Sequence, residues 1–95
     1  MVEMHYVYIL RSAKNKRIYV GYSTDLKARL VRHNEGRVKS TKAYRPWILV
    51  YYEAYLDVHD AARREMQLKM HAAKNALLEQ IKESLDVADG KIRQL

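Results

Sequence analysis

The chain carries the stretch Tyr6-Val7-Tyr8-Ile9-Leu10, followed after a polar gap by Arg17-Ile18-Tyr19-Val20-Gly21. Both halves are rich in Tyr, Val and Ile, which favour strands. The gap from Arg11 to Lys16 contains small and polar residues that favour a turn, where Asn15 could adopt a left-handed conformation at low cost. The pattern therefore predicts a β-hairpin.

Side chains alternate between the two faces of a strand, so Tyr8 and Tyr19 can approach a common centre. Depending on the register, they lie directly opposite each other or diagonally across the hairpin. Gly21 has no side chain, and it therefore leaves room for another group to approach the sheet closely.

A helix is predicted from about Asp25 to Asn34, with Asp25 near its cap and an end near Gly36. Leu26 and Leu30 define its buried stripe, and a helical turn of about 100° per residue places Arg29 and His33 on or beside that face. Two alternatives are open: their stems line the edge of the core with the charged heads in water, or His33 is buried against a backbone carbonyl.

A third strand is predicted at Trp47–Tyr55, apolar on both faces as far as Tyr52, so helices are expected on both sides of the sheet. A helix capped by Asp57 or Asp60 follows. Its expected apolar arc contains Glu65, a position that is costly for a carboxylate without a partner. The arc comprises Ala61, Ala62, Met66, Leu68, Met70 and Ala73. The alternative is an ordinary ion pair between Glu65 and Lys69.

The chain is then expected to form a last helix from Ala76 to Leu85 and a frayed tail, Asp86–Leu95. This order of elements predicts an α/β fold, with a three-stranded antiparallel sheet flanked by helices. We expect one domain over residues 1–85, with residues 86–95 as its tail.

The net charge of +7 is unevenly distributed, because residues 11–45 alone carry a net +9. Such a surface suits a polyanion such as nucleic acid, although a solvated basic surface is the simpler alternative. The expected contacts lie in the basic loop from Gly36 to Pro46 and on the later helix: Arg37, Lys39, Thr41, Lys42, Arg45 and Lys69. The alternative for this loop is a disordered solvated segment.

No cysteine is present, which excludes disulfides, thiolate zinc sites and thiol nucleophiles. The longest apolar run, Ile48–Tyr52, is too short to cross a bilayer. We therefore expect a cytoplasmic protein that does not contact membranes, and the sequence leaves its oligomeric state open.

The hairpin resembles the GIY-YIG nuclease family. Tyr6-Val7-Tyr8 stands where that family has Gly-Ile-Tyr, and Tyr19-Val20-Gly21 stands for Tyr-Ile-Gly. Arg29, His33 and Glu65 then follow in the family's order. The resemblance extends from about Tyr6 to Leu78 and is strongest to small stand-alone members.

The resemblance implies a metal-dependent endonuclease that hydrolyses phosphodiester bonds in DNA, with selectivity for DNA structure and a setting in DNA repair or processing. It implies that Glu65 holds a single Mg²⁺ or Mn²⁺ ion and that Arg29 stabilises charge on the phosphate. Tyr8 is the expected general base with Tyr19 as its partner, and His33 would relay a proton or position the phosphate.

The sequence departs from the family where Tyr6 replaces the first glycine, and Asn75 matches poorly the late asparagine of some relatives. Nothing in it corresponds to the separate DNA-binding domain of larger members. Two alternatives are a module that binds DNA or RNA without productive cleavage and a small protein-interaction domain with incidental charge.

Overall fold

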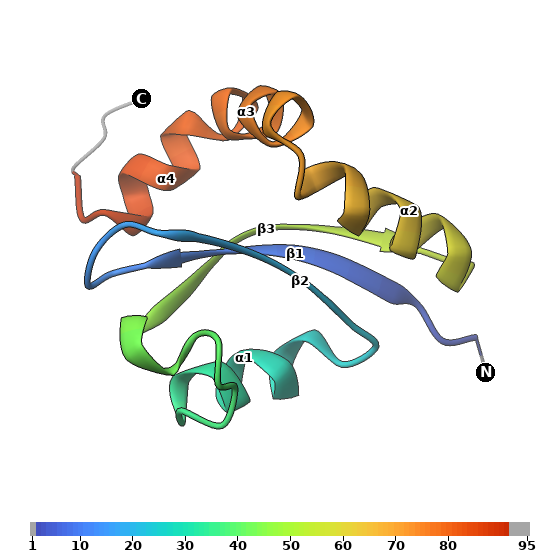
Figure 1. Ribbon diagram of the computed structural model, residues 1–95, viewed down its shortest axis with the longest axis horizontal. Helices are drawn as coiled ribbons and strands as arrows, with labels where there is room; N and C mark the ends of the chain where they lie inside the picture. The colour runs from blue at the N-terminus through green and yellow to red at the C-terminus, as the bar shows by residue number, and fades with distance from the viewer. Residues whose placement is uncertain (1, 92–95) are drawn as a thin grey trace.

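A computed structural model describes residues 2–91 and contains three strands and four α-helices in that range. The α/β class and the three-stranded antiparallel sheet flanked by helices are confirmed (Figure 1). The elements are β1 (His5–Ser12), β2 (Ile18–Ser23), α1 (Leu26–Asn34), a short 3₁₀ helix (Lys42–Tyr44), β3 (Trp47–Tyr55), α2 (Val58–Leu68), α3 (His71–Gln80) and α4 (Lys82–Ala88).

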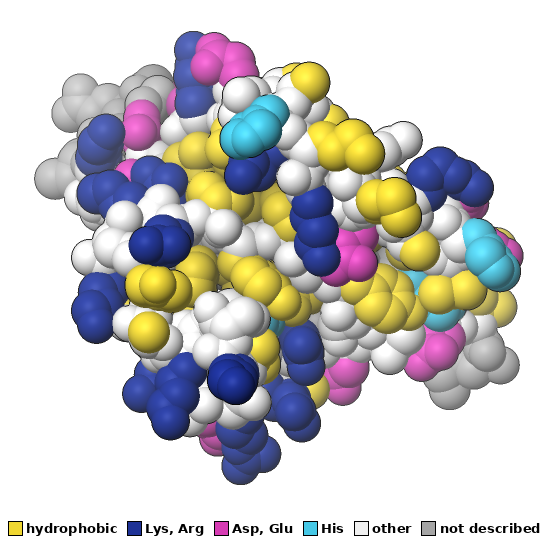
Figure 2. Space-filling model, viewed as in Figure 1, with side chains coloured by type: hydrophobic (Ala, Val, Ile, Leu, Met, Phe, Trp, Pro, Cys, Tyr) yellow, Lys and Arg dark blue, Asp and Glu magenta, His cyan; other side chains and the backbone are white. Residues whose placement is uncertain are grey.

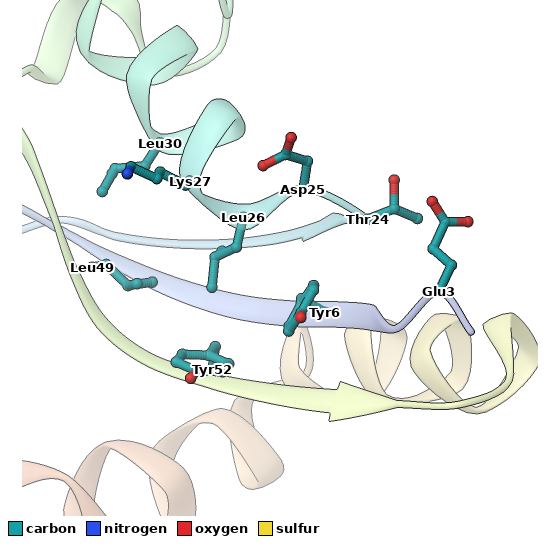
Figure 3. Close-up of a pocket in the computed structure, with 9 residues that line it drawn as sticks. All are labelled: Glu3, Tyr6, Thr24, Asp25, Leu26, Lys27, Leu30, Leu49 and Tyr52. Atoms are coloured by element: carbon teal, nitrogen blue, oxygen red, sulfur yellow. The ribbon is translucent and has the colours of Figure 1, made fainter. Parts of the chain in front are cut away.

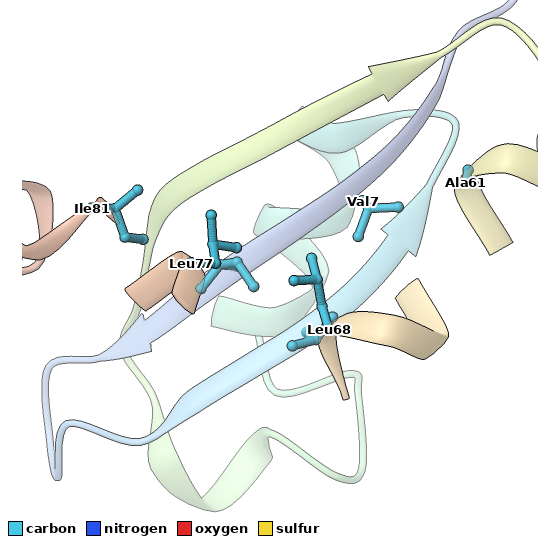
Figure 4. Packing of buried hydrophobic residues seen from close by; sticks show 7 residues of the cluster. Val7, Ala61, Leu68, Leu77 and Ile81 are labelled. Atoms are coloured by element: carbon cyan, nitrogen blue, oxygen red, sulfur yellow. The ribbon is translucent and has the colours of Figure 1, made fainter. Parts of the chain in front are cut away.

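Strand β1 is the centre of the sheet, with the order β2-β1-β3. Helix α1 covers one face, while α2, α3 and α4 cover the other (Figure 1). Because β1 is covered on both sides, its run Val7–Leu10 is fully buried. Val7 and Ile9 pack with Leu68 and Leu77 under the C-terminal helices (Figure 4), and Tyr8 and Leu10 belong to the cluster under α1.

The hairpin turn places its left-handed residue at Lys16, with φ of 64°, and not at Asn15. The side chain of Asn15 instead accepts a hydrogen bond from the backbone N–H of Arg17 at 3.1 Å. This local bond makes an Asx turn, which fixes Asn15 and shifts the left-handed position by one residue.

The basic loop after α1 is ordered, because the Asn34 side chain ties the helix to the start of β3. Asn34 Oδ1 accepts a hydrogen bond from the Trp47 N–H at 2.6 Å, and Asn34 Nδ2 donates to the Trp47 carbonyl at 3.0 Å. The Trp47 indole donates to the Thr41 carbonyl at 2.9 Å. These bonds close the loop from both ends, contrary to the alternative of a disordered segment.

Three helices follow β3, where two were predicted. Helix α2 ends at Leu68, a new helix begins at His71, and a break at Ile81 separates α3 from α4. The predicted apolar arc is too broad, since Met66 and Met70 are 64% and 58% exposed. The buried positions of α2 are Ala61 and Leu68, which belong to one stripe of the helix.

The segment expected to be a frayed tail is ordered as far as the structure describes it. Helix α4 extends to Ala88, and the buried carboxylate of Asp89 accepts hydrogen bonds from Arg11 at 2.8 and 3.0 Å. Lys16 lies 3.3 Å from the same carboxylate. Residues 92–95 lie outside the described range. Within residues 2–91, no helix has the length and apolar character needed to cross a membrane.

Candidate active site

Tyr8 and Gly21 are paired across β1 and β2, which puts Tyr19 on the diagonal from Tyr8. The two phenol rings lie with their centroids 6.3 Å apart. A Cβ atom on Gly21 would overlap the hydroxyl end of the Tyr8 ring. Gly21 therefore leaves space for the Tyr8 phenol itself, as the absence of a side chain suggested.

His33 is fully buried near the end of α1 and bonds through both ring nitrogens. Its Nε2 lies 2.8 Å from the Tyr8 hydroxyl, and its Nδ1 lies 2.8 Å from Thr41 Oγ1. The ring also contacts Tyr19 edge to face, with centroids 5.0 Å apart. His33 is buried, but its partners are two hydroxyls and not a backbone carbonyl.

The direction of these bonds follows from donor and acceptor chemistry. Besides His33, the Tyr8 hydroxyl interacts with Arg29, and a guanidinium can only donate. That contact alone leaves the Tyr8 proton free to go either way, and Thr41 decides the direction. The Thr41 hydroxyl donates its one proton to the Val38 carbonyl at 3.3 Å, so it accepts from His33 Nδ1–H. The unprotonated Nε2 of the neutral ring then accepts from the Tyr8 hydroxyl.

Burial keeps both the Tyr8 phenol and the His33 imidazole neutral. It raises the pKa of the Tyr8 hydroxyl to about 12, although the hydrogen bond from Arg29 acts in the opposite direction. Burial also lowers the pKa of His33 to about 4, and the positive charges of Arg29 and Arg32 add to this effect. At neutral pH the imidazole is therefore an uncharged acceptor for the phenol.

Arg29 brings a permanent positive charge to the two tyrosines. Hydrogen bonding to Tyr8 and Tyr19 raises the pKa of its guanidinium above the usual value. Its Nε is the one buried side-chain nitrogen or oxygen without a hydrogen-bond partner in the described part of the chain. An unpaired buried donor is costly, and an anionic oxygen entering the site would satisfy it.

Glu65 lies on the inward stripe of α2, between Ala61 and Leu68, and its side chain is 26% exposed. Burial is the main cause of the raised pKa of Tyr8, and the negative charge of Glu65 adds a smaller effect in the same direction. Lys69 Nζ lies 3.4 Å from it, so the i,i+4 ion pair also forms.

A polar network that the sequence reasoning missed anchors α2 and thereby positions Glu65. Arg64 donates three hydrogen bonds of 2.8–3.0 Å to the Glu53 carboxylate on β3. Tyr51 and Tyr55 donate to the same carboxylate. The sequence signal for this network was Glu53, which has one tyrosine two residues before it and another two residues after it. Residues at that spacing share one face of a strand.

The donor set fits one divalent ion bound mainly through water and substrate. No group of three or more His, Cys, Asp or Glu side chains able to hold a metal occurs within residues 2–91. Glu65 supplies one partly exposed carboxylate, and Mg²⁺ is often held by one or two carboxylates together with waters and a phosphate.

The basic loop presents its cations to solvent beside this site, and dark-blue side chains gather over α1 and the loop in Figure 2. Lys39, Lys42 and Arg45 are exposed and line a cavity of about 440 Å³ together with Lys14, which was not among the predicted contacts. The signal for Lys14 was its place in the segment of high positive charge.

The other predicted nucleic-acid contacts divide into two groups. Arg37 and Lys69 are exposed, with Arg37 paired to Glu35 at 3.2 Å. Thr41 is fully buried and bonds to His33, so the expectation that it contacts nucleic acid directly was wrong. The loop directs its long cationic side chains outward and this small hydroxyl inward.

Known proteins resemble this chain in sequence and in fold. The family model of the GIY-YIG catalytic domain matches residues 4–77. A UPF0213 protein of Staphylococcus haemolyticus is 40% identical over 74 residues, covering 77% of this chain and 89% of the relative. A UPF0213 protein of Pediococcus pentosaceus is 43% identical over 70 residues, covering 73% of this chain and 73% of the relative.

The fold is also similar to a solved structure of the same group. The solution NMR structure of a UPF0213 protein from Bacillus halodurans superposes with a TM-score of 0.53 at 30% sequence identity. The match covers 94% of this chain and 99% of that one.

Proposed function

Since the chain belongs to the GIY-YIG family, we propose that it is an endonuclease that hydrolyses phosphodiester bonds in DNA, selects DNA by structure, and acts in repair or processing. The observation that carries this proposal is the buried, unpaired Nε of Arg29 beside the Tyr8–His33 bond. Arg29 supplies a cation that can bind a phosphate oxygen, and Tyr8 and His33 form an acid–base pair next to it.

Arg29 binds the scissile phosphate in this proposal. The guanidinium donates to a non-bridging oxygen, and it stabilises the charge that increases as the nucleophile approaches phosphorus. Burial is the main reason that His33 is uncharged, and the positive charge of Arg29 adds to it, so a bound phosphate would offset only this second effect.

Tyr8 and His33 remove a proton from the attacking water. The water gives a proton to the Tyr8 oxygen as the Tyr8 proton passes to His33 Nε2, which leaves an imidazolium and a hydroxide. The hydroxide forms the new P–O bond as the bond from phosphorus to the leaving oxygen breaks. The leaving oxygen takes a proton from solvent, and the imidazolium of His33 returns one proton to solvent, which restores the neutral ring. Glu65 would hold a Mg²⁺ or Mn²⁺ ion, which supplies Lewis-acid stabilisation of phosphate charge.

The test is cleavage of labelled single-stranded, duplex and branched DNA with Mg²⁺ or Mn²⁺ and then with EDTA. Glu65→Gln and Tyr8→Phe should each abolish metal-dependent cleavage while the fold remains. Glu79→Gln is the control for the first, because Glu79 is also paired with a lysine but is exposed on α3. Tyr22→Phe is the control for the second, because Tyr22 also bonds to a histidine, His5, at 2.7 Å. Full activity in either site variant would exclude the proposal.

A module that binds DNA or RNA without cleavage is the second candidate, favoured by the cationic cavity of Lys14, Lys39, Lys42 and Arg45. It predicts binding that weakens steeply with salt and is the same in EDTA and Mg²⁺, in a protein that cleaves none of the three DNA substrates. Binding that is absent or insensitive to salt would exclude this candidate.

A further inference from the structure

A groove of about 740 Å³ lies between α1 and the sheet, beside the candidate active site (Figure 3). Leu26 and Leu30 of α1 line it from one side, and Tyr6, Leu49 and Tyr52 of the sheet line the other. Tyr6 and Tyr52 pack edge to face with centroids 5.8 Å apart, and Tyr52 is 53% exposed. One aromatic ring therefore remains available for stacking with a planar ligand.

The rim of the groove is acidic in a protein with a strong positive charge. Glu3 and Asp25 line it together with one cation, Lys27, and neither carboxylate forms an ion pair within residues 2–91. Asp25 Oδ1 caps α1 by accepting from the Ala28 N–H at 3.1 Å, which leaves Oδ2 as a further acceptor. These carboxylates repel phosphate and accept hydrogen bonds from amino groups.

The groove lies on the same face of the sheet as the candidate active site, because Leu26, Leu30 and Leu49 pack against the cluster that contains Tyr8. Tyr6 and Tyr8 are two residues apart on one face of β1, so their Cα atoms are about 6.6 Å apart. Leu26 and Leu30 lie on either side of Arg29 along α1. A nucleotide whose phosphate contacts Arg29 would therefore present its base, or that of a neighbour, at the mouth of this groove.

We propose that the groove binds an unpaired nucleobase with an exocyclic amino group, stacked on Tyr52 and hydrogen-bonded to the carboxylates of Asp25 and Glu3. This inference rests on the proposed action on nucleic acid. The charge distribution sets the orientation: the backbone lies along Arg29 and the basic loop, and the base lies toward the acidic rim. Adenine, cytosine and guanine carry the required amino group, whereas thymine does not.

The first experiment tests the groove without any phosphate. Deoxycytidine, deoxyadenosine and thymidine are titrated into the protein, and the ring signals of Tyr6 and Tyr52 are followed by NMR. The amino-bearing nucleosides should shift both rings at lower concentrations than thymidine does. Equal effects of all three, or shifts confined to other residues, would overturn the proposal even if the protein cleaves DNA.

The second experiment measures binding of short oligo(dA), oligo(dC) and oligo(dT) to the Glu65→Gln protein, which prevents cleavage during the measurement. Adding Tyr52→Ala should weaken binding of oligo(dA) and oligo(dC) roughly 5- to 150-fold, the range expected for loss of one stacked base. Tyr52→Phe is the matched control and should bind as the parent does. The salt dependence should not change, because Tyr52 contacts no phosphate.

Substitutions at the rim test the hydrogen bonds. Asp25→Asn keeps a good helix cap but replaces the acceptor-only carboxylate, so it should reduce the preference for oligo(dC) over oligo(dT) and leave the fold intact. Unchanged binding by Tyr52→Ala would overturn the proposal. Self-association that Tyr52→Ala abolishes would also overturn it, since the occupant would then be a second copy of the chain.

Discussion

The phenol ring of Tyr8 lies against the backbone of Gly21, its partner across β1 and β2. A Cβ at Gly21 would come within 2.8 Å of Tyr8 Cε2 and closer still to the atoms at the hydroxyl end. The glycine and the tyrosine of the two sequence signatures are thus parts of one packing arrangement. The glycine is required because the Tyr8 hydroxyl is placed directly over the neighbouring strand.

Gly21→Ala should therefore displace Tyr8 and lower the free energy of unfolding by about 1–3 kcal/mol, the usual cost of overpacking. The measurement is urea denaturation of the single variants and of the double variant with Tyr8→Ala. In the Tyr8→Ala background the ring is gone, and the cost of Gly21→Ala should be much smaller. An equal cost in both backgrounds would contradict the packing explanation.

Thr41 Oγ1 lies 2.8 Å from His33 Nδ1, so removal of the hydroxyl should change the orientation of the imidazole ring before it affects the fold. Thr41→Val removes the acceptor for Nδ1–H and should reduce kcat/KM by roughly 10- to 100-fold, as for other residues that orient a functional histidine. Thr41→Ser keeps the hydroxyl and should restore most of the activity. Nitrogen-15 NMR of the His33 ring should show the proton on Nδ1 in wild type and in Thr41→Ser. Nε2–H in wild type would contradict this assignment.

Acid should weaken the tie between the hairpin and the end of α4. Hydrogen bonds from Arg11, followed by those from Lys16, lower the pKa of Asp89 from 3.8 to about 2. A carboxylate with a lowered pKa stabilises the fold fully above its unfolded value, and this contribution is lost as the pH falls from about 3.8 to about 2. Asp89→Asn should lower the free energy of unfolding by about 1–2 kcal/mol at neutral pH. It should also flatten the pH dependence of that free energy in this acidic range. The exposed pair of Asp60 and Arg63 supplies the control, Asp60→Asn, which should retain the wild-type curve.

The cations of the basic loop should act through phosphates and not through base sequence. Lys42→Ala should weaken binding to all DNA sequences similarly and reduce the slope of log Kd against log salt by about 1. Lys82→Ala, which removes an exposed lysine on α4, should leave the slope unchanged. A loss restricted to particular sequences would assign Lys42 a role in base recognition.

Features that depend on local periodicity or capping chemistry could be predicted from the sequence. They are the strands, the caps at Asp25 and Asp57, and the helix face that Arg29 and His33 share. The roles of Thr41 and Asn34 could not. Thr41 turns inward because the loop folds back onto α1. The Asn34 side chain bonds to the Trp47 backbone on the outer edge of β3, where no further strand lies in the described sheet. Both are contacts between segments, for which residue type gives no signal.

The sequence also could not predict how much of the surface of α2 is buried. Met66 and Met70 have the spacing of a buried helical face, but α2 ends at Leu68 and α3 turns away, so nothing covers them among the described residues. Periodicity states which residues can share a face. Which part of that face is covered depends on where the next helix lies.

The Arg11–Asp89 contact joins residues 78 positions apart in the sequence. Closing so long a loop has a high entropic cost, which favours forming such a contact after the local hairpin and helices are in place. On the ribosome, Arg11 and Lys16 emerge long before their acidic partner does. The nascent hairpin therefore carries both cations without their partner Asp89 until α4 has been synthesised, and only then can the Arg11–Asp89 contact form.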